Sequence, residues 1–514
     1  MRSLIQFIIC RVKVQGILFI SAIFLIPIFT FAQSNNHWTR SFNEESSLLS
    51  GAVVGGGAGP SAIYYNPSTI SEISESKFSL HASLFSLNSY KVKNALGDGA
   101  DLKYLRGVIE PRFLSYMIKP KKHPNWRLEV AFLNNESYRI EMTSSIDQTL
   151  DILTNVPGEE RYYSYFQYRN IYRDDWVGFG GSLKLSPKFF VGASMFVSIK
   201  TMEYTYTLDL EAFPLDSVFV DGQYLPFYSA SYMNMEYVKF NDYRLLWKFG
   251  ALYKTDRFSV GINITTPSLG GIYSDGKIAM RKQEQSNITV PETGEPLPNY
   301  IIADYKEKKD VTVNSISPYS IAAGLTYYFP GGTQVLYTTV EYFGGIDPFS
   351  IVSANESPNI GPSYLSAEID FNEWLTFISG VKPVFNAAIG YSWQLKKDLL
   401  IMAGFRTDFN YREDFEDNPR AMSKTMLGPS LDVHHFTTGL SWNIRGQDLI
   451  TGLQYTIGRK RNQQQYLNLT DPVEYNFEET APLQGTKQNT MNTLLNSLSL
   501  YFGATFNFGG GGDK

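Results

Sequence analysis

The sequence predicts an all-β protein: a transmembrane antiparallel β-barrel of fourteen strands with an N-terminal plug in its lumen. Three observations support this class: segments that alternate apolar and polar residues, tight turns that alternate with long polar loops, and an apparent secretion signal. The clearest segment is 258–265, with Phe258, Val260, Ile262 and Ile264 on one face and Ser259, Gly261, Asn263 and Thr265 on the other. A soluble antiparallel sheet could alternate in the same way. The regular spacing of short and long connections favours a closed barrel with its apolar face toward lipid.

Residues 1–32 are predicted to be a signal peptide. A basic start is followed by the apolar run 16–29, which is shorter than a helix that spans a bilayer comfortably. Small residues at Thr30 and Ala32 indicate cleavage after Ala32, and an uncleaved anchor is the alternative. Cys10 is the only cysteine and precedes the apolar run, so lipidation is not expected and the mature chain has no thiol. Disulfides, thiol catalysis and cysteine metal sites are therefore excluded.

Composition limits the partners and indicates the location. The chain has 45 Lys+Arg against 50 Asp+Glu, and this acidic balance argues against a nucleic-acid partner. The 34 Tyr, 35 Phe and 7 Trp are enough to supply aromatic girdles at two membrane interfaces. No segment after the signal reaches the length of an apolar transmembrane helix. Export together with alternating strands predicts the outer membrane of a Gram-negative bacterium.

Fourteen strands are expected, an even number that places both termini on one side of the membrane. They are 77–89, 111–119, 126–134, 176–185, 189–200, 237–253, 258–265, 319–329, 333–342, 384–394, 399–409, 435–444, 449–457 and 498–508. Twelve or sixteen strands are the alternatives. The long connections are expected to be outer loops: 135–175, 201–236, 266–318, 343–383, 410–434 and 458–497. The acidic run 412–418 fits no calcium loop and is interpreted as solvated.

The barrel, predicted to span 77–508, must close. In lipid, an unpaired strand edge would leave backbone groups without partners at several kcal/mol each, so the last strand must pair with the first. Its aromatic end, Phe508, resembles the signal that the outer-membrane assembly machinery recognises. Trp393 and Trp442 lie on the predicted lipid-facing side of their strands, near short turns, and are interpreted as part of the aromatic girdle at the membrane interface. Residues 509–514 are expected to be a flexible tail.

Residues 33–76 do not alternate and are predicted to form a plug, or hatch, inside the lumen. The run 51–61 is rich in glycine and alanine, which allows backbone to pack in a crowded space. A disordered tail is the alternative, but such a tail would not bury the apolar side chains of Ile63, Tyr64, Tyr65 and Ile70. The glycine run lacks the lysine of a phosphate-binding loop, so nucleotide binding is not expected.

The order of parts resembles the FadL family of outer-membrane transporters for long-chain fatty acids and other hydrophobic compounds. The resemblance depends on the small-residue run followed by Tyr64-Tyr65-Asn66-Pro67, and on the segments 247–267 and 317–328. It implies a fourteen-stranded barrel with a hatch that contains Asn66 and Pro67. It also implies capture of a ligand among outer loops, transfer inward, and release through a gap in the wall. Ser68 departs from the family, which usually has alanine there.

A fatty acid carries a carboxylate, which favours a cationic partner. Strand phase places four cations toward the lumen, and we expect one or two of them to bind the head group: Lys200, Arg244, Lys248 and Arg406. The alternative is that they pair with lumenal acids such as Asp408. Apolar material for a ligand lies at 224–228, 232–235 and 343–346. The expected partners are a hydrophobic small molecule, outer-membrane lipids, lipopolysaccharide and the assembly machinery. No cofactor or metal is expected, and the chain is expected to be a monomer.

Two rival functions follow from the same pattern. A barrel hydrolase would need a catalytic histidine, and His434-His435 near Asp432 is the sole candidate pair, without a nucleophile motif or a third metal ligand. We therefore expect no enzyme activity. The second rival is a subunit of a type IX secretion or envelope-assembly system, a role that some FadL-like barrels of Bacteroidetes-type bacteria have, and the resemblance therefore implies a Bacteroidetes-like source.

Overall fold

The computed structural model describes eleven stretches of the chain: 36–73, 76–154, 156–216, 219–220, 223–224, 229–286, 300–353, 376–412, 430–444, 447–479 and 481–507. The predicted signal peptide, Phe508, the tail 509–514 and most of the acidic run 412–418 lie outside the described residues, as does 225–228. No described helix is long and apolar enough to cross a membrane.

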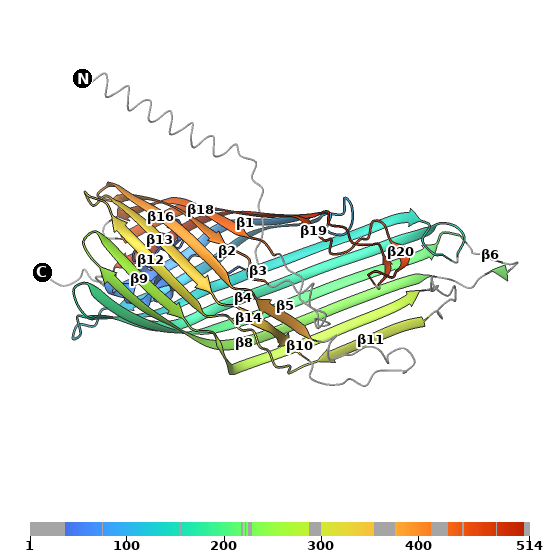
Figure 1. Cartoon of the computed structure of the whole chain (residues 1–514), viewed down its shortest axis with the longest axis horizontal. Coiled ribbons are helices and arrows are strands. Elements are labelled where there is room, and N and C mark those ends of the chain that lie inside the picture. The colour runs from blue at the N-terminus through green and yellow to red at the C-terminus, as the bar shows by residue number, and fades with distance from the viewer. Residues whose placement is uncertain are drawn as a thin grey trace, which may run out of the picture.

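Within the described stretches, fourteen strands form a closed antiparallel ring (Figure 1). In chain order they are β1 (Lys77–Lys93), β2 (Leu102–Ile118), β3 (Trp126–Leu150), β4 (Glu160–Lys184), β5 (Phe189–Pro214), β8 (Ala230–Lys254), β9 (Phe258–Thr265), β12 (Ser320–Tyr328), β13 (Gln334–Phe343), β16 (Val384–Lys396), β17 (Leu399–Asp408), β18 (Val433–Ile444), β19 (Gln447–Gln463) and β22 (Met491–Asn507). Each pairs with its neighbours along the chain. Each predicted strand corresponds to one of them.

The ring closes between the first and the last strand, as the sequence predicts. β22 pairs with β1 from Lys77 opposite Asn507 to Lys93 opposite Asn492. β8 has two partners on the same side. Its residues 248–254, near the short turn, pair with β9, and its residues 231–245, in the outer half, pair with β10 (Leu269–Ser286). β10 in turn pairs with β11 (Tyr300–Lys308). Small hairpins make up the rest of the strands: β6 (Phe219–Val220) with β7 (Gln223–Tyr224), β14 (Ile346–Val352) with β15 (Phe377–Val381), and β20 (Val473–Asn476) with β21 (Ala481–Gln484).

The predicted faces are also confirmed. On β9, Phe258 and Ile262 are exposed on the outside, whereas Ser259 and Asn263 are buried in the lumen. Trp393 and Trp442 are exposed near the turn ends of β16 and β18, as expected for an interface girdle. The exterior near the short turns is therefore apolar, and the chain is a transmembrane antiparallel barrel.

Three of the predicted loop regions are wrong. The region 266–318 contains the paired strands β10 and β11, and the regions 135–175 and 201–236 are largely strand. β3, β4, β5 and β8 continue through them and project far beyond the short strands (Figure 1). Along β5 the polarity inverts while the alternation continues. Outward positions change from Val197 and Ile199 to Thr201 and Glu203, and the buried inward positions change from Ser198 and Lys200 to Tyr204, Leu208 and Leu210. The outer part of the wall is thus a water-facing sheet with an apolar interior. The sequence prediction missed it because it assumed that the apolar residues stay on one face along a whole strand.

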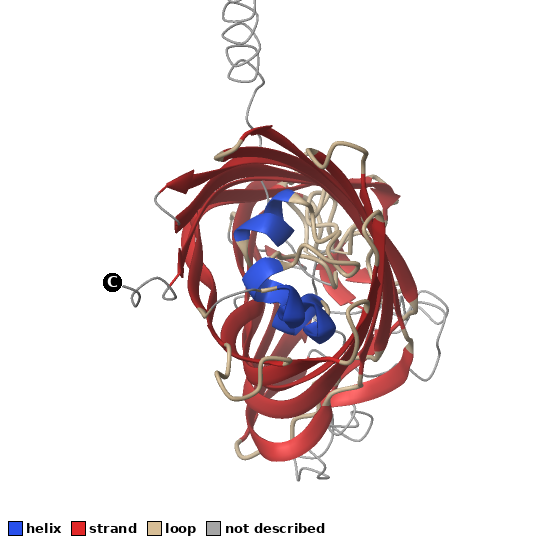
Figure 2. Cartoon of the chain, turned by 90° about the vertical axis from the view of Figure 1, so that its left-hand side faces the viewer, coloured by secondary structure: helices blue, strands red, loops and turns tan. Residues whose placement is uncertain are grey.

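The N-terminal segment, residues 36–73, lies inside the ring (Figure 2). It contains four short helices: α2 (Glu44–Leu48), η1 (Gly59–Ser61), α3 (Ala62–Tyr65) and η2 (Pro67–Glu72). Its backbone lies against glycines of the inner wall. A Cβ built on Gly250 would come within 2.0 Å of the Asn66 side-chain oxygen, and one on Gly324 within 2.3 Å of the Gly55 nitrogen. The wall and the segment are complementary only because these positions have no side chain.

One seam of the wall, here called the wall break, is open in its outer half. β2 pairs with β3 only from Phe113 opposite Leu133 to Ile118 opposite Leu128. Farther out, β2 pairs with β1 and β3 pairs with β4, but they do not pair with each other. Both strands are irregular at this level: Arg112 falls in a register shift against β1, and Asn135 in one against β4. Pro111, which has no backbone N–H, suits the edge of a sheet.

Candidate functional site

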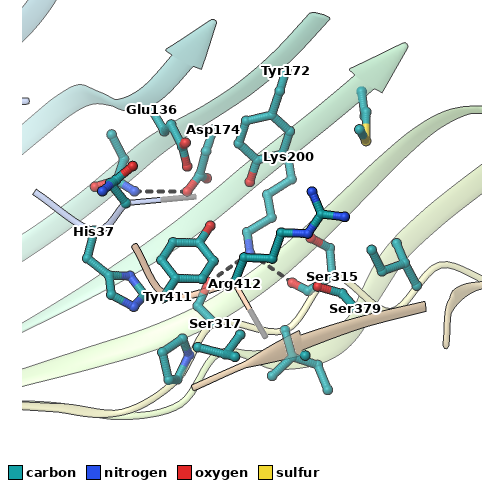
Figure 3. Close-up of a pocket in the computed structure, with 18 of the residues that line it drawn as sticks. His37, Glu136, Tyr172, Asp174, Lys200, Ser315, Ser317, Ser379, Tyr411 and Arg412 are labelled. Carbon is teal, nitrogen blue, oxygen red and sulfur yellow. Dashed lines mark hydrogen bonds between the residues drawn. The ribbon is translucent and has the colours of Figure 1, made fainter. Parts of the chain in front are cut away.

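A cavity of about 180 Å³, the central cavity, lies between the N-terminal segment and the outer part of the barrel (Figure 3). Long strands supply one side of it, through residues of β3, β4, β5 and β8. The N-terminal segment supplies Asn36, His37 and Thr39. The stretch 315–318, the β14–β15 hairpin, Tyr411 and Arg412 supply the rest. The cavity is therefore built by segments that are far apart in the sequence and meet only in the closed barrel.

The polar part of the central cavity is centred on Lys200 and two carboxylates. The Lys200 Nζ donates to the Ser315 carbonyl at 2.8 Å and to the Ser317 Oγ at 2.7 Å (Figure 3). Asp174 accepts from the Ser198 hydroxyl at 2.6 Å, and Glu136 lines the same cavity. Lys200 is thus held in place by neutral acceptors, and its charge still faces the cavity.

The same cavity has apolar lining: Met202, Phe240, Phe349, Ile351 and Ile378. Flexible methionine and aliphatic side chains suit an apolar ligand of irregular shape. A cavity with charged groups and apolar groups can hold an amphiphile, with its head among the charges and its tail against the apolar residues.

His37 is packed between two aromatic rings. Its ring lies 4.0 Å from that of Phe343 and 4.3 Å from that of Tyr411, stacked on both. Its Nε2 has no hydrogen-bond partner in the described part of the chain, and its accessible surface faces the central cavity. Burial, and then the charge of Lys200, lower the pKa of His37 to about 3. The imidazole is therefore neutral at ordinary pH.

The structure places all four predicted cations toward the lumen but does not bring them together. Lys200 lines the central cavity, and its contact with a ligand stays a prediction. Arg244 forms a 3.0 Å ion pair with Asp242, so for this residue the pairing alternative holds with a different acid from Asp408. Lys248 donates to the Thr265 hydroxyl at 2.9 Å and lies 4.3 Å from the centre of the Tyr64 ring. The Arg406 Nη1 donates to the Ser41 hydroxyl.

The four predicted plug residues lie in the N-terminal segment and are packed against one another or the wall. The Asn66 side chain donates to the Val54 carbonyl at 2.8 Å and to the Ala251 carbonyl of β8 at 3.3 Å. Tyr64 and Tyr65 are in edge contact, with ring centres 5.1 Å apart. Pro67 begins η2 and approaches Gly192, whose added Cβ would lie 2.4 Å from the Pro67 carbonyl carbon.

The two histidines of the hydrolase alternative do not form a pair. His435 is fully buried in the lumen, with its Nε2 3.5 Å from an Asp408 carboxylate oxygen and its Nδ1 2.8 Å from the Thr456 hydroxyl. His434 lies on the other face of β18, stacked against Phe405. In the stretches that the structure describes, no three His, Cys, Asp or Glu side chains are grouped to hold a metal ion.

Sequence reasoning missed Glu136 and Asp174 because they fall within 135–175, which was interpreted as a loop. The alternation of the predicted strands could have located them. Asp174 lies two residues before the predicted strand that begins at 176, so an extension of that strand places Asp174 on its inward face.

Comparisons with known proteins agree with this architecture. No protein-family model matches the sequence, and no curated protein matches it. Among solved structures, the P. putida toluene transporter TodX matches with a TM-score of 0.55 at 13% identity, over 91% of this chain and 99% of that chain. A Pseudomonas aeruginosa FadL homologue matches with a TM-score of 0.50 at 11% identity, over 93% of this chain and 100% of that chain. The chain therefore has the fold of a FadL homologue, and the fold that the sequence resemblance implied is confirmed.

Proposed function

We propose that this chain is an outer-membrane transport protein that passes hydrophobic molecules, such as long-chain fatty acids, by passive diffusion. One observation carries the proposal: a lipid-facing barrel whose lumen is filled by its own N-terminal segment has a cavity above that segment and a break in the wall beside it. The shared fold with TodX, a toluene transporter, and with a FadL homologue supports the same function.

The route runs from the central cavity sideways through the wall break. Thr39, Tyr138 and Tyr172 line both the central cavity and a second cavity that lies at the break. A ligand that leaves the central cavity past these side chains reaches the open edges of β2 and β3 without crossing the N-terminal segment. That segment is the plug of this mechanism, and Asn66, Pro67, Tyr64 and Tyr65 hold it. Lys200 is the predicted cation best placed to meet a head group.

The route can be blocked at a single position. Val108 faces the second cavity from β2, whereas its neighbour Ile109 is 73% exposed on the outer face. We expect Val108→Trp to lower uptake of a labelled long-chain fatty acid severalfold, and Ile109→Trp to leave it unchanged. Cells that lack other fatty-acid transporters and express each variant provide the assay.

The assay requires equal amounts of assembled barrel for each variant. Uptake no greater than that of cells without the protein would contradict transport. In that case, a partner that co-purifies with the barrel would support the role of a secretion or envelope-assembly subunit.

A further inference from the structure

A patch of cations, here called the basic patch, lies on the outer face of the wall that β19, β22, β1 and β2 form. Tyr90 and Val92 of β1 are buried in the interior, so the lysine between them faces outward. The same alternation turns one exposed cation outward on β2, between Leu102 and Tyr104, and another on β19, after Gly458. The basic patch consists of four residues: Lys91, Lys93, Lys103 and Arg459.

Strand pairing places these cations in one row. Lys91 lies opposite Lys103 of β2 on one side and opposite Leu494 of β22 on the other. Leu494 in turn lies opposite Arg459 of β19, and Lys93 lies two residues farther out on β1. Because neighbouring strands are about 4.8 Å apart, the row from Lys103 to Arg459 spans about 14 Å. The patch is therefore wider than a single phosphate group.

The positive charge of the basic patch is only partly balanced. Asp101, at the end of the turn between β1 and β2, lies 3.2 Å from the Lys91 Nζ and 3.9 Å from the Lys103 Nζ. Neither Lys93 nor Arg459 forms an ion pair within the described stretches. One carboxylate shared by two lysines thus leaves an excess of positive charge on this surface.

Two further acids lie near the patch, but neither forms an ion pair with it in the part of the chain that the structure describes. Asp98 is exposed in the turn between β1 and β2, and Asp432, which precedes β18, accepts from a backbone amide at 3.0 Å. The excess of positive charge on this part of the wall favours an anion. On the outer face of β3 and β4, by contrast, cations pair with carboxylates of the same face: Arg139 with Glu141 at 2.8 Å and Arg173 with Asp175 at 2.5 Å.

Toward the short turns, the same four strands expose apolar side chains. Leu105 of β2, two residues from Lys103, is 68% exposed. The others are Phe85 of β1, Leu500 of β22 and Tyr455 of β19. The basic patch therefore lies at the outer edge of the lipid-facing surface, at the level of lipid head groups. A cluster of Lys and Arg beside a membrane-spanning segment is typical of a site for anionic lipid head groups.

We propose that the basic patch binds the phosphate groups of the phosphorylated glycolipid of the outer leaflet, lipopolysaccharide. The acyl chains of this lipid lie against the apolar surface beside the patch. Its two phosphates, at opposite ends of a disaccharide, match a row that spans about 14 Å, whereas a phospholipid with one phosphate occupies only part of the row. The four cations line neither the central cavity nor the second cavity, so this inference goes beyond the proposed function.

The test measures binding of lipid A, the phosphorylated lipid part of lipopolysaccharide, to the purified full-length barrel in a neutral detergent by native mass spectrometry. We expect Lys93→Gln, Lys103→Gln and Arg459→Gln together to weaken lipid A binding by about tenfold or more. Binding of lipid A whose phosphates have been removed should change less than about twofold. The three side chains are exposed, so the variant is expected to fold.

The matched control removes the same number of cations from the outer face of β8, β10 and β4: Lys239→Gln, Lys277→Gln and Arg161→Gln. It should retain the affinity for lipid A within about twofold. An equal loss in the two triple variants would show that total charge decides binding, and would overturn the site.

Three other outcomes would also overturn the proposal. The first is that lipid A does not bind the native barrel. The second is that phosphatidylglycerol binds as tightly as lipid A and depends equally on the three cations, which would assign the patch to anionic phospholipids. The third is that inorganic phosphate displaces lipid A at equal concentration, which would indicate a site for the free anion. Fatty-acid uptake is measured separately, so failure of transport and failure of this site are distinguishable.

Discussion

At the scale of single residues, the Asn66 side chain links separate parts of the N-terminal segment and also links that segment to the barrel. Its amide donates to the Val54 and Ala251 carbonyls, and its Oδ1 accepts from the Ser68 amide at 3.2 Å and the Ser68 hydroxyl at 2.6 Å. We expect Asn66→Ala to loosen the segment by about 1–3 kcal/mol, because it leaves buried groups unpaired. Ion conductance across planar bilayers should rise. Ser71→Ala, which removes a single part-buried hydrogen bond to Ser182, is the control, and an equal rise there would contradict this role.

His37 makes the seating of the same segment depend on pH. Its folded pKa of about 3 lies below the ordinary value of 6.5, so the displaced segment binds the proton more readily than the seated one. Stability is therefore fully present above pH 6.5 and is lost as the pH falls from 6.5 toward 3, by about 1–2 kcal/mol at pH 5. We expect hydrogen exchange of residues 36–43 to increase from pH 7 to pH 5 relative to His37→Phe at each pH. Phe keeps the stacking on Phe343 and Tyr411, and identical exchange in both proteins would refute the role of His37.

At the scale of elements, the inner glycines of the strands determine where the N-terminal segment can pack. Gly250 of β8 lies against Asn66, and we expect Gly250→Ala to push the segment away, because the new Cβ would overlap the Asn66 side chain and approach the Ser68 nitrogen at 3.0 Å. Conductance should rise as for Asn66→Ala. The matched change is Gly181→Ala on β4, where the Cβ would meet Leu128 and Arg127 instead of the segment. Normal conductance in Gly250→Ala would show that the segment does not depend on this contact.

The strands near the short turns are predictable from the sequence, whereas their outer halves are not. The range 258–265 was predicted to the residue, because alternation and a polar turn coincide there. β5 was expected to end at Lys200 and runs to Pro214, because the apolar positions move from the lipid face to the inner face at that point. Alternation of residue types indicates a strand. A prediction that requires the apolar residues to stay on the same face ends the strand too early, at the point where the surroundings change from lipid to water.

The candidate site is predictable only in part for the same reason. The inward phase placed Lys200 at the central cavity, but phase alone could not separate it from Arg244, whose acid Asp242 is two residues away on the same face. The wall break had a sequence signal, since Pro111 suits an edge strand. The second cavity had no such signal, because three of the arginines that line it, Arg40, Arg112 and Arg173, come from separate elements that meet only after the barrel closes.

At the scale of the whole molecule, the inversion along β5 marks where the membrane ends, near Ile199 on its outer face. The run 189–199 is about the length of a strand that crosses the apolar band of an outer-membrane barrel. Met195 faces outward near the middle of this run, and Thr205 faces outward beyond it. We expect Met195→Arg to lower the free energy of unfolding by about 2–4 kcal/mol, because it places a charge near the bilayer midplane. Thr205→Arg should change it little, since water already covers that surface. Urea unfolding of the barrel in lipid vesicles measures both, and equal losses would mean that the outer half of β5 is also embedded in lipid.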